Sequence, residues 1–206
     1  MSFFQNTRKP TGLGGKLMLV MMNLGHSPVA RWGLHFLNVS QNAKVLDCGC
    51  GGGANIKRLL KKCPQGIIKG IDYSPVSVEK SKKVNQAAIA EGRCAVMQGS
   101  VADMIFADDR FDAVTAFETV YFWPDLPQCF REVWRVLKPD GIFLICNESC
   151  GDTDQDEKWT KIIDGMTIYQ DTELKAFLEQ VGFHDILIHK KKSWLCVTAR
   201  KSGNKA

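Results

Sequence analysis

The stretch VLDCGCGGG, residues 45–53, is the part of the sequence that decides the fold. It combines a short apolar run, in which Asp47 stands, with a turn rich in glycine and cysteine. A helical pattern, NIKRLLKKC, follows at 55–63. Strand, glycine-rich turn and helix in this order are typical of the ligand-binding corner of an open α/β sheet, because glycine lets the backbone turn tightly and approach a ligand closely. The stretch therefore predicts an α/β protein with its ligand at this turn.

Apolar runs and helical patterns alternate along the chain after this turn. The apolar runs predict strands at 43–49, 66–72, 94–100, 111–118 and 141–148. Ser74 and Pro75 are typical of a helix start, and this helix is predicted to continue to about Gly92. Between 125 and 139 the apolar residues recur with the spacing of an amphipathic helix. Strands this apolar indicate a parallel sheet that helices cover on both faces.

The last part of the chain predicts a short helix followed by a hairpin. The helix opens at Asp171 or Thr172 and ends at Gly182, and two strands at 184–189 and 193–199 flank three lysines. A tight turn of this kind joins only antiparallel strands. The predicted fold class is therefore α/β: a doubly wound, Rossmann-like sheet of seven mostly parallel strands that ends in an antiparallel β-hairpin.

The composition is that of one globular domain. The chain has 206 residues, of which 45% are hydrophobic and 24% charged, and this length supports one large core. We assign residues 41–206 to the domain and residues 1–40 to an N-terminal helical lid or extension. The net charge of +5 is too small to predict nucleic-acid binding, and the apolar run at 17–25 is too short to span a membrane. We expect a cytoplasmic protein that binds neither nucleic acid nor membrane, with a homodimer left open as its quaternary state.

The glycine turn is compatible with more than one ligand. Cys48 and Cys50 lack the spacing typical of zinc sites, so no metal is predicted there. The turn also matches the dinucleotide pattern G-x-G-x-x-A, which begins at Gly49. Asp72 follows the next strand about 20 residues on, where a ribose-binding acid is expected. This match is weak evidence when taken alone.

One further residue separates the ligand classes. Asp47 stands two positions before the first glycine of the turn, at the end of the first predicted strand. A carboxylate in that place repels a pyrophosphate but suits a ligand that carries an ammonium or sulfonium group and no phosphate. S-adenosylmethionine is such a ligand, and its ribose still gives Asp72 two hydroxyls to bind.

Four segments in order resemble a known superfamily. They are VLDCGCGGG at 45–53, GIDYSP at 70–75, FDAVTAFETVYFWPD at 111–125 and REVWRVLKPDGIFLI at 131–145. The chain resembles the class I S-adenosylmethionine-dependent methyltransferases, and within them the small-molecule enzymes related to ubiquinone and menaquinone biosynthesis methyltransferases. The segments are specific to superfamily and fold, and none of them specifies the substrate.

The resemblance implies roles for the residues around the methionine part of this cofactor. Gly49, Cys50 and Gly51 would pass beneath it. Asp47 would contact its amino group directly or through water. Glu118, which follows the fourth strand, would lie beside the methionine part or the entering substrate.

The resemblance also implies the contacts of the adenosine part. Asp72 would bind both ribose hydroxyls, with Tyr73 beside the adenine. Ser100 and Val101, after the third strand, would line the adenine. Many relatives carry an aspartate where Ser100 stands, so the adenine contact there differs in this chain.

Candidates for the acceptor side come from segments that the predicted core does not use. Tyr121 and Trp123 follow the fourth strand and are expected at the rim of the crevice, where rim packing is the alternative. His26, in the N-terminal lid, is the candidate base or acceptor contact, and Trp32 a candidate pocket wall. Tyr169 is expected to reach the pocket from the segment before the last helix. We therefore assign His26 and Tyr121 as catalytic, and Trp32, Trp123 and Tyr169 as substrate-binding.

The sequence thus predicts an S-adenosylmethionine-dependent methyltransferase that transfers a methyl group to a small-molecule acceptor by in-line displacement. Such a reaction depends on alignment and water exclusion, and it needs a base only where the acceptor carries a proton. The alternatives are a Rossmann-type NAD(P)-dependent oxidoreductase and a catalytically silent cofactor-binding adaptor. Against the first, no tyrosine in the chain has a lysine four residues on.

Overall fold

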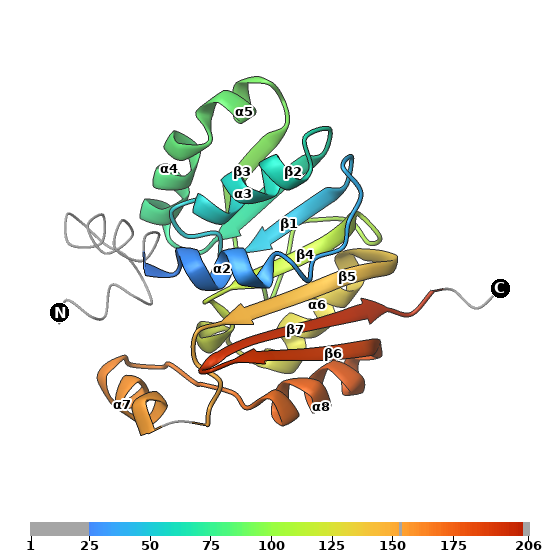
Figure 1. Cartoon of the computed structure of the whole chain (residues 1–206). Coiled ribbons are helices and arrows are strands. Elements are labelled where there is room, and N and C mark those ends of the chain that lie inside the picture. Colours follow the sequence, from blue (N-terminus) through green and yellow to red (C-terminus); the bar gives the residue numbers. More distant parts are fainter. Residues whose placement is uncertain (1–24, 153, 204–206) are drawn as a thin grey trace.

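Seven strands form one sheet in the order β3-β2-β1-β4-β5-β7-β6 within the computed structural model, which describes residues 25–152 and 154–203 (Figure 1). The strands are β1 (Lys44–Cys48), β2 (Ile67–Asp72), β3 (Cys94–Gln98), β4 (Phe111–Phe117), β5 (Leu137–Asn147), β6 (Phe183–Lys191) and β7 (Trp194–Lys201). The helices are α2 (Ser27–Gly33), α3 (Ala54–Lys62), α4 (Pro75–Val84), α5 (Gln86–Ala90), α6 (Leu126–Val136), α7 (Asp154–Ile162) and α8 (Asp171–Val181), with a short 3₁₀ helix η2 (Val120–Phe122).

The strand order places a topological switch between β1 and β4. From β1 the chain winds outward to β2 and β3, then returns to β4 on the other side of β1. All pairs from β3 to β5 are parallel, while β7 pairs antiparallel with both β5 and β6. The predicted doubly wound sheet with a terminal hairpin is confirmed. In such sheets the ligand crevice lies beyond the carboxyl ends of the strands at the switch.

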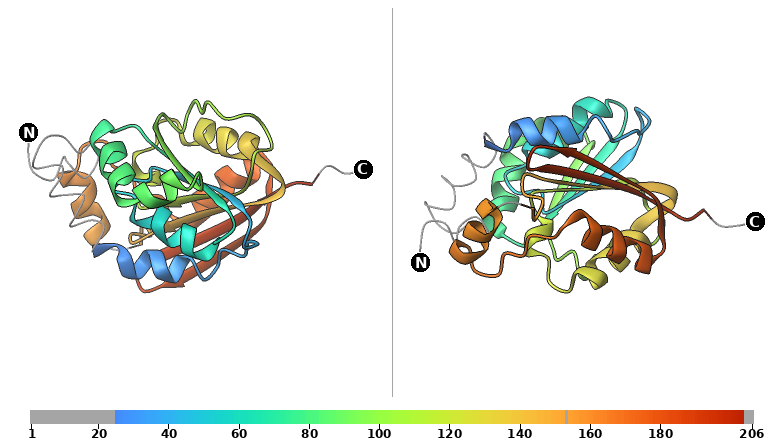
Figure 2. Two further views of the ribbon diagram at one scale, coloured as in Figure 1. Left: turned by 90° about the horizontal axis from the view of Figure 1, so that it is seen from above. Right: turned by 60° about the horizontal axis from the view of Figure 1, so that its bottom comes forward.

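Each face of the sheet has its own core because successive strand residues point to opposite faces. Leu46 of β1 belongs to the core under α6 and α8, whereas its neighbour Val45 belongs to the core under α2, α3 and α4. Figure 2 shows α6 and α8 on one side of the sheet and α2 and α3 on the other. Both residues are fully buried. The apolar runs that predicted the strands therefore reflect burial on two sides.

The helix predicted from Pro75 to about Gly92 is wrong in one respect, because it is two helices. Ser74 caps the first with its hydroxyl and Pro75 begins it, as predicted. At Asn85 the backbone leaves the helical region, and the side-chain amide donates to the carbonyls of Gly53 and Ser81, each at 3.0 Å. These bonds tie the end of α4 to the glycine turn and interrupt the helix.

The acidic segment after β5 contains the helix α7. Asp156 is buried and accepts a hydrogen bond from the Gly151 backbone at 3.0 Å. Asp152 instead pairs with Lys190 of the hairpin at 2.8 Å. At least these two acids hold the segment in place rather than merely solvating it.

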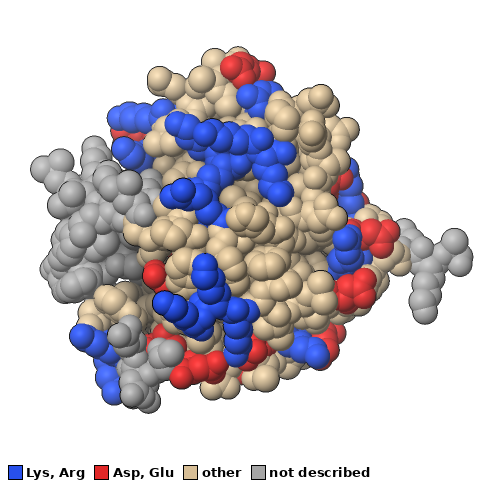
Figure 3. All heavy atoms as spheres, in the orientation of Figure 1, with Lys and Arg blue, Asp and Glu red and all other residues tan. Residues whose placement is uncertain are grey.

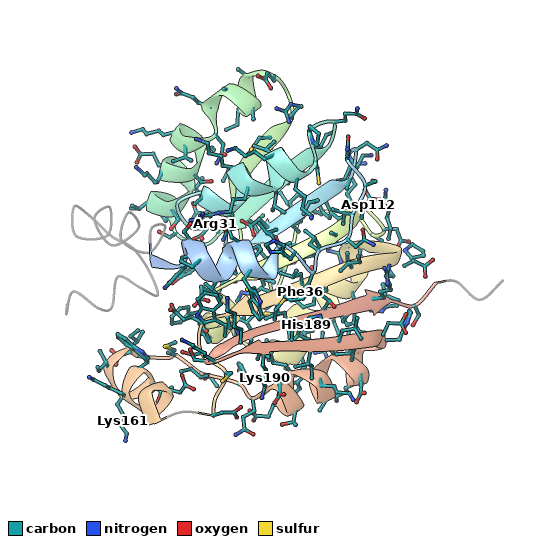
Figure 4. All side chains as sticks on the ribbon, viewed as in Figure 1. Arg31, Phe36, Asp112, Lys161, His189 and Lys190 are labelled. Carbon is teal, nitrogen blue, oxygen red and sulfur yellow. The ribbon has the colours of Figure 1, made fainter. Side chains whose placement is uncertain are left out.

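The described part of the N-terminal segment docks on the hairpin. Trp32 of α2 packs on Trp194, with ring centroids 5.8 Å apart. Phe36 stacks on His189 of β6 at 3.7 Å with nearly parallel rings (Figure 4). Residues 1–24 of the predicted lid lie outside the described residues, and the division at residue 40 stays a prediction. Within the described residues, no helix has the length and apolar character needed to cross a bilayer.

Basic side chains gather on one face of the molecule over α3. Figure 3 shows Lys and Arg concentrated there, in the orientation of Figure 1. The helix is amphipathic: Lys57 and Lys61 are exposed, while Ile56 and Leu59 are fully buried. The charge on this helix therefore marks its solvent face, which is what a helix laid on a sheet requires.

Candidate active site

A cavity of about 370 Å³ lies beyond the carboxyl ends of β1 to β4, within the part of the chain that the structure describes. Its wall is made by the turns that follow these four strands, by the first turn of α3 and by α2. The predicted site residues on this wall are His26, Gly49, Cys50, Gly51, Asp72, Tyr73, Ser100, Val101, Glu118 and Trp123. The cavity is therefore at the crevice that the strand order predicts.

The glycine turn is hydrogen-bonded to the end of β2. Gly49 and Cys50 both donate backbone hydrogen bonds to the carbonyl of Ile71, at 2.8 and 3.0 Å. Gly51 has a φ of +50°, and a Cβ added there would meet no atom within 4 Å. A Cβ at Gly49 would instead overlap the Thr119 side chain. The turn thus presents bare backbone to the cavity at Gly51.

Asp72 joins the glycine turn to the start of α4. One carboxylate oxygen accepts from the backbone N–H of Gly51 and the other from that of Ser74, both at 2.9 Å. Burial raises the pKa of Asp72, and these backbone hydrogen bonds oppose the rise. The Ser77 side chain also hydrogen-bonds this carboxylate, whose roughly four acceptor sites still leave capacity for a ligand hydroxyl.

Asp47 lies behind the cavity wall rather than on it. It is 1% exposed, and one carboxylate oxygen accepts from the Thr115 hydroxyl at 2.8 Å. The other oxygen is buried and has no hydrogen-bond partner among the described residues. Burial raises the pKa of Asp47 to about 7. A buried carboxylate with one unsatisfied oxygen is costly for the fold, so a cationic group close to it would be stabilising.

Three ionisable groups meet at another part of the site. His26 Nε2 lies 3.6 Å from Glu148 Oε2, and both are close to the carboxylate of Glu118. Burial lowers the pKa of His26, although Glu148 opposes this. Burial, followed by repulsion from Glu148, raises the pKa of Glu118 to about 8. The sequence predicted His26 and Glu118 as separate site residues, and the structure brings them together.

Besides Asp47, three predicted site residues, all aromatic, do not line the described cavity. Trp32 packs against Phe36 and Trp194 on the other side of α2. Tyr169 packs against Phe177 of α8 with its ring perpendicular, 6.2 Å between centroids. These placements correct the prediction that both rings form the pocket wall. Each ring found an apolar partner outside the crevice.

Tyr121 is also off the wall, and its hydroxyl is already engaged. The ring is 4% exposed. Its hydroxyl donates to the carbonyl of Ser149 at 3.4 Å and accepts from the Ser149 backbone N–H at 3.0 Å. The Tyr121 side chain also hydrogen-bonds Glu118, which is on the wall, so the catalytic role of Tyr121 stays a prediction. Trp123 does reach the wall, but it is 8% exposed and stacks on Phe143, so it is largely a core residue.

Replacing Tyr121 with phenylalanine tests whether its hydroxyl is structural. Removal of the hydroxyl leaves the Ser149 backbone groups unpaired, so we expect the free energy of unfolding to fall by about 1–2 kcal/mol. Cofactor affinity should stay within a factor of two, because the hydroxyl does not face the cavity. Urea unfolding and calorimetric titration measure the two quantities. A large loss of affinity at unchanged stability would support the original assignment.

Sequence reasoning missed Arg58 of α3, which lines the cavity. Its guanidinium donates to Asn55 Oδ1 at 2.7 Å and to the Ser27 hydroxyl of α2 at 2.6 Å. It therefore links the first turn of α3 to the N-terminal segment. Asn55 and Arg58 are three residues apart and share a helix face. That spacing, measured from the glycine turn, is a signal that could have identified both.

The comparisons with known proteins agree with this geometry. Residues 46–145, from β1 to β5, match the family model described as "Methyltransferase domain". Over these residues the chain is therefore similar to that family. The matched range includes the glycine turn, Asp72 and Glu118, and thus most of the cavity wall. The whole β6–β7 hairpin and α2 lie outside it.

Individual relatives show the same likeness. The chain is 33% identical over 109 residues to cycloartenol-C-24-methyltransferase 1 of Oryza sativa, and this match covers 53% of this chain and 31% of that protein. It is 29% identical over 165 residues to YrhH of Bacillus subtilis, covering 80% and 82%. The chain spans about a third of the length of the first of these relatives.

Solved structures share the fold of this chain. A chain in the complex containing the Haloferax volcanii Trm112 methyltransferase activator superposes with a TM-score of 0.79 at 21% identity, covering 92% of this chain and 95% of that one. YcgJ of Bacillus subtilis gives 0.72 at 18% identity, covering 87% and 100%. At such identities the likeness concerns the fold alone.

Proposed function

We propose that this chain is an S-adenosylmethionine-dependent methyltransferase that acts on a small-molecule acceptor. The observation that carries the proposal is the Asp47 carboxylate behind the glycine turn, with one buried oxygen that has no partner among the described residues. A negative group there disfavours a pyrophosphate and favours a cationic, phosphate-free cofactor. The domain match at 46–145 supports the same conclusion.

The residues present fit this cofactor. The open space above Gly51 is a cradle for a ligand that approaches bare backbone. Asp72 would bind the ribose hydroxyls, and Ser100 and Val101 on the same wall would line the adenine. The unpartnered oxygen of Asp47 would receive the ammonium of the methionine part directly or through water. Tyr73, 40% exposed at the wall, would cover the adenine from the solvent side.

Bound S-adenosylmethionine would supply a methyl group activated by a sulfonium. The chain's own contribution would be alignment and exclusion of water. The apolar side chains of Phe117, Phe122 and Trp123 on the wall would keep water from the reacting centre. His26 remains the candidate for contact with the acceptor, because its imidazole lies on the wall and burial keeps its pKa low.

The kind of acceptor is a finer part of the proposal. Several relatives are named for sterols, and YrhH spans most of this chain without a named substrate class. The sterol names support a small-molecule acceptor, and the link to ubiquinone and menaquinone enzymes stays a prediction from sequence resemblance. The homodimer and the cytoplasmic location stay predictions as well.

Calorimetric titration tests the function. We expect the purified chain to bind S-adenosylmethionine and its demethylated product, and to bind NAD at least tenfold more weakly. Binding of NAD alone would contradict the proposal and favour the oxidoreductase. Tight binding of S-adenosylmethionine without methyl transfer across a broad acceptor screen would favour the silent adaptor.

An Asp72→Ala variant tests the site. Loss of hydrogen bonds between a charged group and the ribose hydroxyls should weaken S-adenosylmethionine binding by about 1.5–3 kcal/mol. The control is Asp108→Ala, an exposed acid at the opposite end of β4 that pairs with Arg135. Titrations of both variants, with urea unfolding to exclude misfolding, provide the measurement. Equal affinities in the two variants would mean that the site is misplaced.

A further inference from the structure

Three metal-ligand side chains converge from three separate segments. His26 precedes α2, Glu118 follows β4, and Glu148 follows β5. One donor atom of each lies within 4.8 Å of the others. The two glutamates meet because β4 and β5 pair in parallel, with Phe117 opposite Cys146, so the residues after their carboxyl ends are neighbours.

The docking of α2 on β5 brings in the histidine. The Cys146 thiol lies 3.5 Å from the carbonyl of Val29, and a Cβ on Gly33 would overlap that sulfur. Gly33 therefore sets how closely α2 can approach the strand. This contact places His26, which caps the helix, beside Glu148.

Among the described residues, the cluster holds two carboxylates and one imidazole whose donor atoms lie close together. Glu118 Oε1 is buried and has no hydrogen-bond partner within the described chain. Glu118 also has a φ of +57°, a left-handed conformation that is costly for a residue other than glycine. Strained non-glycine residues of this kind concentrate at binding and catalytic sites.

We propose that His26, Glu118 and Glu148 bind one divalent first-row metal ion, of the type of Mn²⁺ or Zn²⁺, at the edge of the cavity. One imidazole and two carboxylates form a mixed nitrogen and oxygen donor set. Mg²⁺ prefers oxygen ligands and retains its water, so it fits this set less well. The ion would neutralise both carboxylates and give Glu118 Oε1 a partner.

The geometry is compatible with such an ion after small side-chain movements. Ligand atoms that are each about 2.1 Å from one ion lie roughly 3.0–3.4 Å apart in octahedral or tetrahedral coordination. The imidazole and the Glu148 carboxylate are 3.6 Å apart. Glu148 is about half exposed and can move. Three protein ligands leave coordination positions open, as in catalytic rather than structural metal sites.

The role of the ion's open coordination positions rests on the proposed function. His26 and Glu118 both line the cavity, so an ion between them would face the acceptor. It would hold an acceptor oxygen and lower the pKa of a hydroxyl there. His26 would then act on the acceptor through the ion and not as a free base. Binding of the ion itself does not depend on methyl transfer.

Metal titration of the chelator-treated, full-length chain tests the site. We expect Mn²⁺ and Zn²⁺ to bind with a stoichiometry of one per chain by calorimetry, and Mn²⁺ to give the electron paramagnetic resonance signal of a protein-bound ion. Mg²⁺ should bind at least tenfold more weakly. Glu118→Gln, Glu148→Gln and His26→Ala should each weaken Mn²⁺ binding at least tenfold.

The control is Glu91→Gln, which removes an exposed carboxylate paired with Arg93 and should leave Mn²⁺ affinity unchanged. Thermal unfolding checks that each variant folds. Glu148→Gln changes the most exposed ligand and is therefore the variant with the least risk of misfolding. Absence of saturable Mn²⁺ binding, or equal binding by all four variants, would overturn the metal site. S-adenosylmethionine titrated alone gives a separate result, so failure of the metal site and failure of the methyltransferase proposal are distinguishable.

Discussion

A Gly51→Ala substitution is expected to weaken S-adenosylmethionine binding at least ~100-fold, about 2.7 kcal/mol. Gly51 lines the cavity, and its missing side chain leaves space in which a Cβ would meet no protein atom. In the proposed complex that space belongs to the cofactor. A methyl group would therefore collide with the ligand and not with the fold.

The loss of stability caused by Gly51→Ala should be small and can be separated from the loss of affinity. Gly51 has a φ of +50°, so alanine there should lower the free energy of unfolding by about 1–2 kcal/mol through backbone strain alone. Gly92, at the end of α5, gives a matched control: its φ is +72° and a Cβ there also meets nothing within 4 Å. Gly92→Ala should show the same loss of stability and no loss of affinity.

The measurements are calorimetric titration and urea unfolding of both variants. Unchanged affinity in both Gly51→Ala and Gly92→Ala would mean that the cofactor does not pass over the turn. An equal loss in both would point to general destabilisation. Only a loss confined to Gly51→Ala supports the proposed position of the cofactor.

The turn and its carboxylates were predictable because their signals are local. Asp47, the glycines and Asp72 each occupy a fixed position relative to a strand end, and strand ends in a parallel sheet meet at one edge. The alternation of apolar runs and helical patterns likewise predicted the order of strands and helices and the terminal hairpin. These features depend on neighbours that are close in sequence or fixed by the strand order.

The acceptor side was less predictable because its residues lie between elements. An aromatic side chain such as Tyr121 or Tyr169 gains by burial either in a pocket or against a helix, and the sequence does not distinguish these outcomes. The His26 cluster depends on how closely α2 approaches β5, which is set by Gly33 against Cys146. No spacing along the chain reveals that contact. The strand order alone would have placed Glu118 near Glu148, because the two residues follow neighbouring parallel strands.

The Asp47→Asn variant should change stability and binding in opposite directions. Burial raises the pKa of Asp47 from 3.8 to about 7. Below about pH 4 the group is protonated in both folded and unfolded chains and has no effect. As pH rises from 4 to 7, the unfolded chain releases the proton while the folded chain retains it, so the free energy of unfolding falls. Above pH 7 the loss is complete and on the order of 4 kcal/mol.

Asparagine does not titrate, so the variant should escape this penalty. We expect Asp47→Asn to be more stable than the natural chain at pH 8, with the difference shrinking toward pH 4. Asp112→Asn is a control for which the opposite change in stability is expected. The side chain of Lys138 and the backbone of Lys44 lower the pKa of Asp112. That variant should be less stable than the natural chain at pH 8. Urea unfolding at several pH values measures both differences.

Asp47→Asn should weaken cofactor binding although it stabilises the fold. The ammonium of S-adenosylmethionine would pair with the ionised carboxylate, so Asp47→Asn should lose about 1.5–3 kcal/mol of binding free energy at pH 8. The natural chain should also bind more tightly as pH rises through 7, a dependence on Asp47 that the variant lacks. A more stable protein with undiminished affinity would reduce Asp47 to a structural residue. A more stable protein that binds poorly would explain why the fold keeps a buried carboxylate that destabilises it, since its unsatisfied oxygen would be completed only by the cofactor.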